Sequence, residues 1–118
     1  MTRPLAYVCV ANNENNKIKA RCRALYELGY LPVCPSLMFN RFLEVSCAEE
    51  REDARIMSEE VLRRCRLLVT FGEINDDMAR EIMLARRLGI ITTSFGGLSK
   101  VAKAIAESAI SEGEDAGA

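Results

Sequence analysis

Apolar and polar residues alternate along the chain in blocks that predict four strands, each followed by a helix. The short apolar runs cover residues 5–10, 30–34, 67–71 and 90–93. Runs that are apolar on both faces are typical of strands buried in a parallel sheet. Between these runs, apolar residues recur every three or four positions, which is the spacing of an amphipathic helix. The pattern therefore predicts β-α-β-α-β-α-β-α and an α/β fold class.

The predicted helices begin and end at recognisable residues. Gly29 and Gly89 stand where a helix commonly ends in a left-handed residue. The S-x-x-E pattern of Ser46 and Glu49 is that of a capping box and predicts a helix to about residue 64. Asn75 predicts a further helix start, because two acidic residues follow it in the first turn.

Two of these helices carry clear inward faces. For the helix after Ser46 the predicted inward residues are Cys47, Arg51, Ala54, Ser58, Val61 and Cys65. For the helix after Asn75 they are Met78, Ile82, Ala85 and Leu88. Both sets follow the helical period, so each face should pack on the sheet.

The position of Pro32 predicts the order of the strands. Proline cannot donate a hydrogen bond to a sheet ladder, so the second strand belongs at an edge. Right-handed crossovers then favour the order 2-1-3-4. We expect a single-domain three-layer α/β/α sandwich with a flavodoxin-like parallel sheet of four to five strands. The domain is expected over residues 1–111, followed by a flexible, small and acidic C-terminal tail over 112–118.

This strand order also predicts where a ligand would bind. The direction of winding reverses between the first and third strands, and ligands bind at the carboxyl ends of strands at such a point. Val10, Ala11 and Gly72 follow the ends of those strands, and Asp76 and Glu81 belong to the next helix. We expect these residues to converge on one crevice.

Glu81 is unusual because it falls in the middle of the apolar face of its helix. A glutamate is almost never fully buried unless it is paired. Two interpretations are open. The side chain reaches water or an arginine near the sheet edge, or its carboxylate lines a pocket and carries chemistry.

Two further features leave alternatives open. The connection over residues 35–45 is too apolar for a plain surface loop, so it is either a flap over a site or an extra turn packed on the core. Arg51 either lays its stem along apolar surface with its head in water, or binds a carboxylate or phosphate.

Composition excludes several classes of function. The 118 residues include 17 acids and 16 bases, giving a net charge of −1, so no nucleic-acid polymer or membrane surface is indicated as a partner. There is no histidine, so acid–base chemistry falls to other side chains. Neither G-x-G-x-x-G nor G-x-x-x-x-G-K-[ST] occurs, and we expect no cofactor and no metal.

The five cysteines and the absence of a membrane-length apolar run indicate a cytoplasmic location. The cysteine count is odd, no C-x-x-C pair occurs, and three cysteines fall on predicted core faces. These features favour buried thiols in a reducing compartment over disulfides or zinc ligands. The sequence also shows no signal peptide.

Several short matches occur in an order that resembles the nucleoside 2-deoxyribosyltransferase-like family, in particular its small bacterial and phage members. The resemblance covers roughly residues 5–93. Tyr7 stands where the family has a tyrosine on its first strand, and residues 29–35 look like its GY-x-P-x-x-P run. Arg51 matches an arginine after an acidic turn, and residues 78–81 match the end of its G-M-x-x-E stretch. Each match is weak alone, but their order and spacing are fairly specific.

The resemblance implies roles for particular residues. Glu81 would be the nucleophile that acts on an N-glycosidic bond, Tyr7 would orient it, and Asp77 or Asp76 would manage a proton at the leaving base. The further expected substrate contacts, from the nearby loops and helix starts, are Val10, Ala11, Asn12, Asn13, Arg51, Gly72, Asp76 and Met78. The resemblance also implies a homodimer or a higher even-numbered homo-oligomer, and the apolar residues 38–43 suit such a contact.

Departures from the family pattern keep two functions open. The family's S-G-P segment is Cys9-Val10-Ala11 here, its glycine before the methionine is Asp77, and Ser36 and Arg66 replace a common histidine and aspartate. The first hypothesis is a deoxyribosyltransferase or N-glycosidase acting on a nucleoside or nucleotide. The second is a binding module, a sensor or a sequestering protein, that keeps the crevice but has lost turnover.

Overall fold

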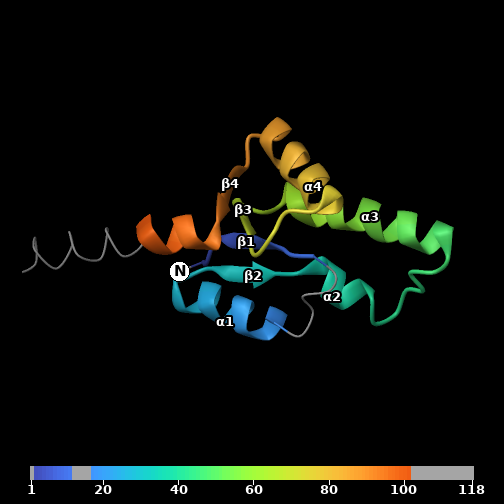
Figure 1. Ribbon diagram of the computed structural model, residues 1–118, viewed down its shortest axis with the longest axis horizontal. Coiled ribbons are helices and arrows are strands. Elements are labelled where there is room, and N and C mark those ends of the chain that lie inside the picture. Colours follow the sequence, from blue (N-terminus) through green and yellow to red (C-terminus); the bar gives the residue numbers. More distant parts are fainter. Residues whose placement is uncertain (1, 12–16, 102–118) are drawn as a thin grey trace, which may run out of the picture.

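The computed structural model describes residues 2–11 and 17–101. Its strands and helices, in chain order, are β1 (Leu5–Cys9), α1 (Ile18–Glu27), β2 (Leu31–Val33), α2 (Pro35–Phe39), α3 (Ala48–Arg63), β3 (Leu67–Thr70), α4 (Asp76–Arg87) and β4 (Ile91–Ser94) (Figure 1). Residues 95–101 are also helical. The predicted tail over 112–118 lies outside the described residues, as does the end of the predicted domain.

The described strands form a four-stranded parallel sheet in the order β2-β1-β3-β4. The predicted fold class and strand order are therefore confirmed. Tyr7 on β1 is in register with Val33 on β2 and with Leu68 on β3, so β1 lies inside the sheet. Pro32 lies on the edge strand, where its missing N–H costs no hydrogen bond within the sheet.

Side chains alternate across the sheet and form a core on each face. On one face Tyr7, Cys9 and Leu68 pack with residues of α3 and α4. On the other face Ala6, Val8 and Val69 pack with Leu25 of α1 and with the helical residues after β4. Figure 1 shows α3 and α4 on one side of the sheet and α1 on the other, which completes the three layers.

The starts of α4 and α3 differ in how well the sequence predicts them. The Asn75 side-chain oxygen accepts a 2.9 Å hydrogen bond from the Met78 backbone N–H, so the predicted cap of α4 is confirmed. The predicted capping box of α3 is wrong. Cys47 is the N-cap and makes no side-chain cap hydrogen bond. The helix begins one residue later than the capping box requires, and the Ser46 hydroxyl donates to the Glu44 carboxylate at 3.0 Å.

The predicted inward faces also need correction. Met78, Ile82 and Ala85 are buried as expected, but Leu88 follows the last helical residue of α4 and is 38% exposed. On α3 the fully buried residue is Leu62, which the predicted stripe omits, whereas Val61 is only partly buried. The α3 helix is rotated so that Ser58 and Leu62, rather than Cys47 and Val61, face the sheet most directly.

The apolar connection after β2 forms a short helix. Pro35 starts α2, since a proline at the first position of a helix removes an N–H that has no helical partner anyway. Phe39 is buried, as expected of an extra turn packed on the core. Phe42 lies edge-on to Phe39 at 6.0 Å between ring centroids and remains 63% exposed.

The two helix starts generate a stability prediction. Asn75→Ala removes the oxygen that accepts the Met78 N–H, and such a loss typically costs about 1 kcal/mol. Ser46→Ala is the matched control, because the Ser46 hydroxyl caps no backbone N–H in α3. Urea unfolding should show a clear decrease in the free energy of unfolding for Asn75→Ala. For Ser46→Ala this free energy should change by no more than about 0.5 kcal/mol. Equal losses would contradict the assignment.

Candidate functional site

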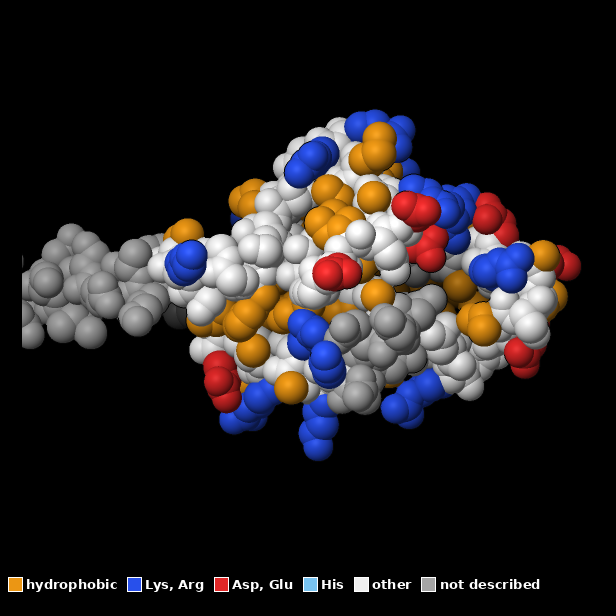
Figure 2. Space-filling model, in the orientation of Figure 1, with side chains coloured by type: hydrophobic (Ala, Val, Ile, Leu, Met, Phe, Trp, Pro, Cys, Tyr) orange, Lys and Arg blue, Asp and Glu red, His pale blue; other side chains and the backbone are white. Residues whose placement is uncertain are grey.

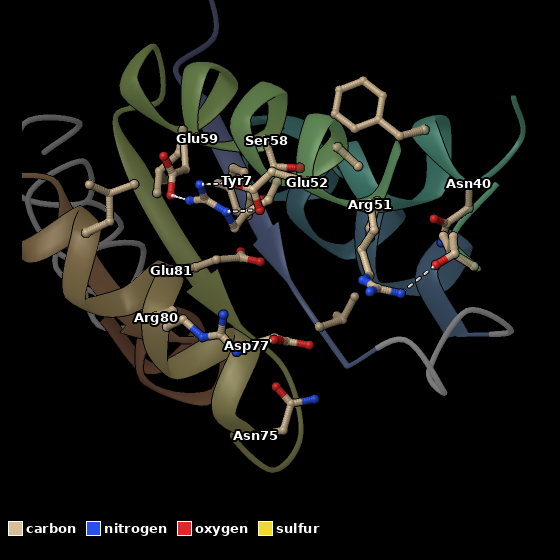
Figure 3. Close-up of a pocket in the computed structure, with 18 of the residues that line it drawn as sticks. Tyr7, Asn40, Arg51, Glu52, Ser58, Glu59, Asn75, Asp77, Arg80 and Glu81 are labelled. Carbon is tan, nitrogen blue, oxygen red and sulfur yellow. Dashed lines mark hydrogen bonds and ion pairs between the residues drawn. The ribbon is translucent and has the colours of Figure 1, made fainter. Parts of the chain in front are cut away.

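A cavity of about 560 Å³ lies on the sheet face that α3 and α4 cover (Figure 3). Its size is typical of sites that bind small molecules. β1 contributes Tyr7, and Val10 directly follows that strand. α3 and α4 form the walls, and residues at the ends of α2 close one end. The cavity therefore lies near the carboxyl end of β1, where the strand order predicts a crevice.

Glu81 extends from α4 into the space between α3 and α4 (Figure 3). The Asn75 cap fixes where α4 begins, and Met78, Ile82 and Ala85 fix which face packs on the sheet. Glu81 stands on the flank of that face and is half-buried. The Tyr7 hydroxyl and the Cys9 thiol, both on β1, are the donor groups that interact with its carboxylate.

These surroundings raise the pKa of Glu81 to about 7. The largest cause is burial, which disfavours the charged carboxylate. The hydrogen bonds from Tyr7 and Cys9 act in the opposite direction, and the negative charge of Asp77 raises the pKa further. Within the described part of the chain, Glu81 makes no ion pair with an arginine or lysine. The carboxylate is thus held by neutral donors alone.

Tyr7 is buried and remains protonated at neutral pH. Burial raises its pKa far above the usual range, and the charge of Glu81 and their hydrogen bond raise it further. A hydrogen bond with Ser58 of α3 partly offsets this pKa increase. A protonated phenol is a permanent donor, so Tyr7 can orient the Glu81 carboxylate over a wide pH range.

The other charged side chains of the cavity are held in local interactions. Arg55 is bound by Glu59 at 2.6 Å and by both carboxylate oxygens of Glu52. Arg80 is 3.1 Å from the Asp77 carboxylate. Arg51 donates a 3.0 Å hydrogen bond to the Val45 carbonyl. On the face shown in Figure 2, acidic and basic side chains accordingly lie close together around α3 and α4.

The structure brings five of the predicted site residues to the cavity: Tyr7, Val10, Arg51, Asp77 and Glu81. Four others do not line it. Met78 is 1% exposed in the core, Ala11 packs against that core, Gly72 forms the turn after β3 with a φ of 75°, and Asp76 is exposed. Asn12 and Asn13 lie outside the described residues.

Sequence reasoning missed several cavity residues. The main ones are Ser36, Asn40, Glu52, Arg55, Glu59 and Arg80. The spacing of Glu52, Arg55 and Glu59 is the signal that was available, because residues three and four apart on a helix form ion pairs. Asn40 gave no signal, since its place in the cavity depends on how α2 packs against α3.

Among the described residues, no group of three or more histidine, cysteine, aspartate or glutamate side chains could hold a metal ion. No helix in the described ranges is both long and apolar enough to cross a membrane. All five cysteines are described and are free thiols, and Cys9 and Cys65 are buried.

The fold and the cavity define an α/β domain with a cavity of ligand size near the carboxyl end of β1, where the direction of winding of the parallel sheet reverses. The sequence matches the family described as "Domain of unknown function (DUF7768)" over residues 4–95, so the chain belongs to this family. A search of curated proteins gave no significant match.

A comparison with solved structures found a similar fold. A 2-deoxyribosyltransferase from the psychrotolerant bacterium Bacillus psychrosaccharolyticus superposes with a TM-score of 0.63 and is 17% identical in sequence. The match covers 76% of this chain and 70% of the other. At this identity the similarity shows a shared fold.

The environment of Glu81 generates a prediction about stability. Its pKa is raised from 4.5 to about 7 on folding, so the folded state binds a proton that the unfolded state has released. The stability that this proton provides is present below about pH 4.5 and is lost as the pH rises through 7. Glu81→Gln removes the buried charge and should stabilise the protein at pH 8 by up to roughly 3 kcal/mol.

Urea unfolding between pH 4.5 and 8 measures this effect. The gain of Glu81→Gln over wild type should shrink toward pH 4.5, where the folded carboxyl is protonated. Glu60→Gln, on the exposed side of α3, controls for the general effect of removing a carboxylate. A Glu81→Gln protein that is less stable than wild type at pH 8 would show that Glu81 has a cationic partner.

Proposed function

We propose that this protein breaks the N-glycosidic bond of a nucleoside or nucleotide, as a deoxyribosyltransferase or an N-glycosidase. The observation that carries the proposal is the Glu81 carboxylate, half-buried in a ligand-sized cavity and held by neutral donors instead of a cation. The similarity of the fold to a 2-deoxyribosyltransferase supports the class of substrate.

The proposed mechanism uses the unpaired charge of Glu81. Breaking the bond between the sugar and the base passes through a state with positive charge at the anomeric carbon. The electron pair of the C–N bond leaves with the base, while a Glu81 oxygen stabilises the cation or bonds to that carbon. Water, or a second base, then attacks the same carbon and releases Glu81.

Two neighbours of Glu81 have proposed supporting roles. Tyr7 donates to the carboxylate and holds it in one orientation. Asp77 lines the cavity beside Glu81 and is the candidate to carry a proton to the leaving base. Val10 and Arg51, which also line the cavity, are proposed substrate contacts.

A specific observation favours a binding module as the second candidate. The resembled family has a glycine where this chain has Asp77, and the Asp77 side chain lines the cavity. Its negative charge also raises the pKa of Glu81, so a fraction of the carboxylate is protonated at neutral pH. A nucleotide sensor or sequestering protein would tolerate both features.

The predicted homo-oligomer remains a proposal. Met38 and Phe42 are 55% and 63% exposed, and both belong to the segment that closes one end of the cavity. Exposed apolar side chains of this size suit a contact between subunits. A contact here would bring a second subunit close to the site.

The enzyme proposal is tested by incubating the protein with a panel of nucleosides and nucleotides and measuring free base. Glu81→Gln keeps the shape of the side chain but removes the charge that stabilises the anomeric cation. Base release should fall by roughly 10²-fold or more, because losing one such group typically costs several kcal/mol of barrier. Ligand affinity should stay within about tenfold, and Glu60→Gln should release base like wild type.

Two results would separate the candidates. Wild-type protein that binds a nucleotide but releases no base over a day would reject the enzyme and leave the binding module. Base release that survives in Glu81→Gln would reject Glu81 as the nucleophile. For the enzyme, activity should rise with pH up to about 7, since only the ionised carboxylate acts.

A further inference from the structure

Charges in the cavity are distributed unevenly between its two ends. Among the described residues that line it, three are arginines and four are acids: Arg51, Arg55, Arg80, Glu52, Glu59, Asp77 and Glu81. Most of them neutralise one another within a single helix. The exceptions are Arg51 and Glu81, which have no ion-pair partner among the described residues. Their positions indicate what kind of ligand fits.

Arg55 and Arg80 have carboxylate partners. Arg55 lies between Glu52 and Glu59 on α3, and this trio retains a net negative charge. Arg80 pairs with Asp77 one turn earlier on α4. An anionic ligand at Arg55 would meet two carboxylates already in place, so the trio disfavours a second anion.

Arg51 has no carboxylate partner among the described residues. The interaction it makes is the hydrogen bond to the Val45 carbonyl, which places its guanidinium against the connection between α2 and α3. A guanidinium has five N–H groups, so most of its donors and its full charge face the cavity or solvent. Asn40 and Ser36 also line the cavity and add neutral donors.

The α3 helix runs from the Arg51 end of the cavity toward the end at Glu81. Positions 51 and 58 share a face of the helix and lie two turns apart, about 10 Å along its axis. Ser58 interacts with Tyr7, and Tyr7 interacts with Glu81. Figure 3 shows Arg51 on the α2 side of the cavity and Glu81 on the α4 side. Arg51 and Glu81, which have no ion-pair partner among the described residues, therefore lie on opposite sides of the cavity.

We propose that the ligand carries a phosphate ester on its sugar and is a nucleoside monophosphate, with the phosphate bound by Arg51. The inference rests on the proposed function for the nucleoside part and adds its phosphorylation state. The cavity then matches an anion at one end and the developing cation of the anomeric carbon at the other. An arginine with free donors suits a phosphate, because its planar fork binds two phosphate oxygens at once.

The test compares each 2′-deoxynucleoside with its own 5′-monophosphate, so that the base and sugar are constant within a pair. Binding is measured by calorimetry on the full chain, in wild type and in the Glu81→Gln background to prevent turnover. The monophosphate should bind about 10- to 100-fold more tightly, as expected for a charge-assisted, two-oxygen contact. Arg51→Gln should remove this preference, and Arg51→Lys should keep part of it.

Arg63→Gln is the matched control. Arg63 is an exposed arginine on the same helix outside the cavity, so its loss changes the net charge equally and should leave the preference intact. Circular dichroism of each variant checks that the fold is retained. A third ligand, 2-deoxyribose 5-phosphate, has no base and should also bind in an Arg51-dependent way.

The outcomes separate the phosphate inference from the proposed function. Equal affinity for nucleoside and monophosphate, a preference that survives Arg51→Gln, or no monophosphate binding up to millimolar concentration overturns the inference, even where base is released. An Arg51-dependent preference without base release upholds the phosphate site and rejects the enzyme. If 2-deoxyribose 5-phosphate binds to Arg51→Gln as tightly as to wild type, this result also counts against the site.

Discussion

A carboxylate that is removed from water without a cation beside it is a strong constraint on a protein of this size. Folding must hold Glu81 in place although its charged form is disfavoured, and the raised pKa of about 7 reflects this cost. The Tyr7 and Cys9 donors reduce the cost only in part. Glu81 stays in this position because Met78, Ile82 and Ala85 fix which face of α4 packs on the sheet.

The remaining structure supports this arrangement. The order β2-β1-β3-β4 places β1 inside the sheet, so Tyr7 and Cys9 are buried directly below α4. α3 forms the facing wall, where Arg55 is paired with Glu52 and Glu59 rather than with Glu81. Arg51, at the far end of that wall, is the arginine left for a ligand. Under the proposed function, the Arg51 end of the cavity binds an anion and the Glu81 end stabilises a cation.

The fold could be predicted from the sequence because its determinants are local. Apolar periodicity gives the order of strands and helices, Pro32 places its strand at the edge, and Asn75 marks the start of α4. Features that depend on packing could not be predicted. The α3 helix begins one residue later than the Ser46 pattern predicts, and Leu62 became its buried residue through the rotation of that helix. Glu81 could be recognised because a charged residue falls on the apolar face of its helix. The sequence around Arg55 and Asn40 shows no such mismatch.

The central claim, that the Glu81 carboxylate acts on the anomeric carbon, is tested most directly by trapping a covalent intermediate. A nucleoside monophosphate with fluorine at sugar C2 destabilises the positive charge at the anomeric carbon, so a bond to the nucleophile persists long enough to detect. Intact mass spectrometry should show one added fluorosugar phosphate, and peptide mapping should place it on Glu81. Base release from the unmodified substrate together with an adduct on another residue would contradict the account.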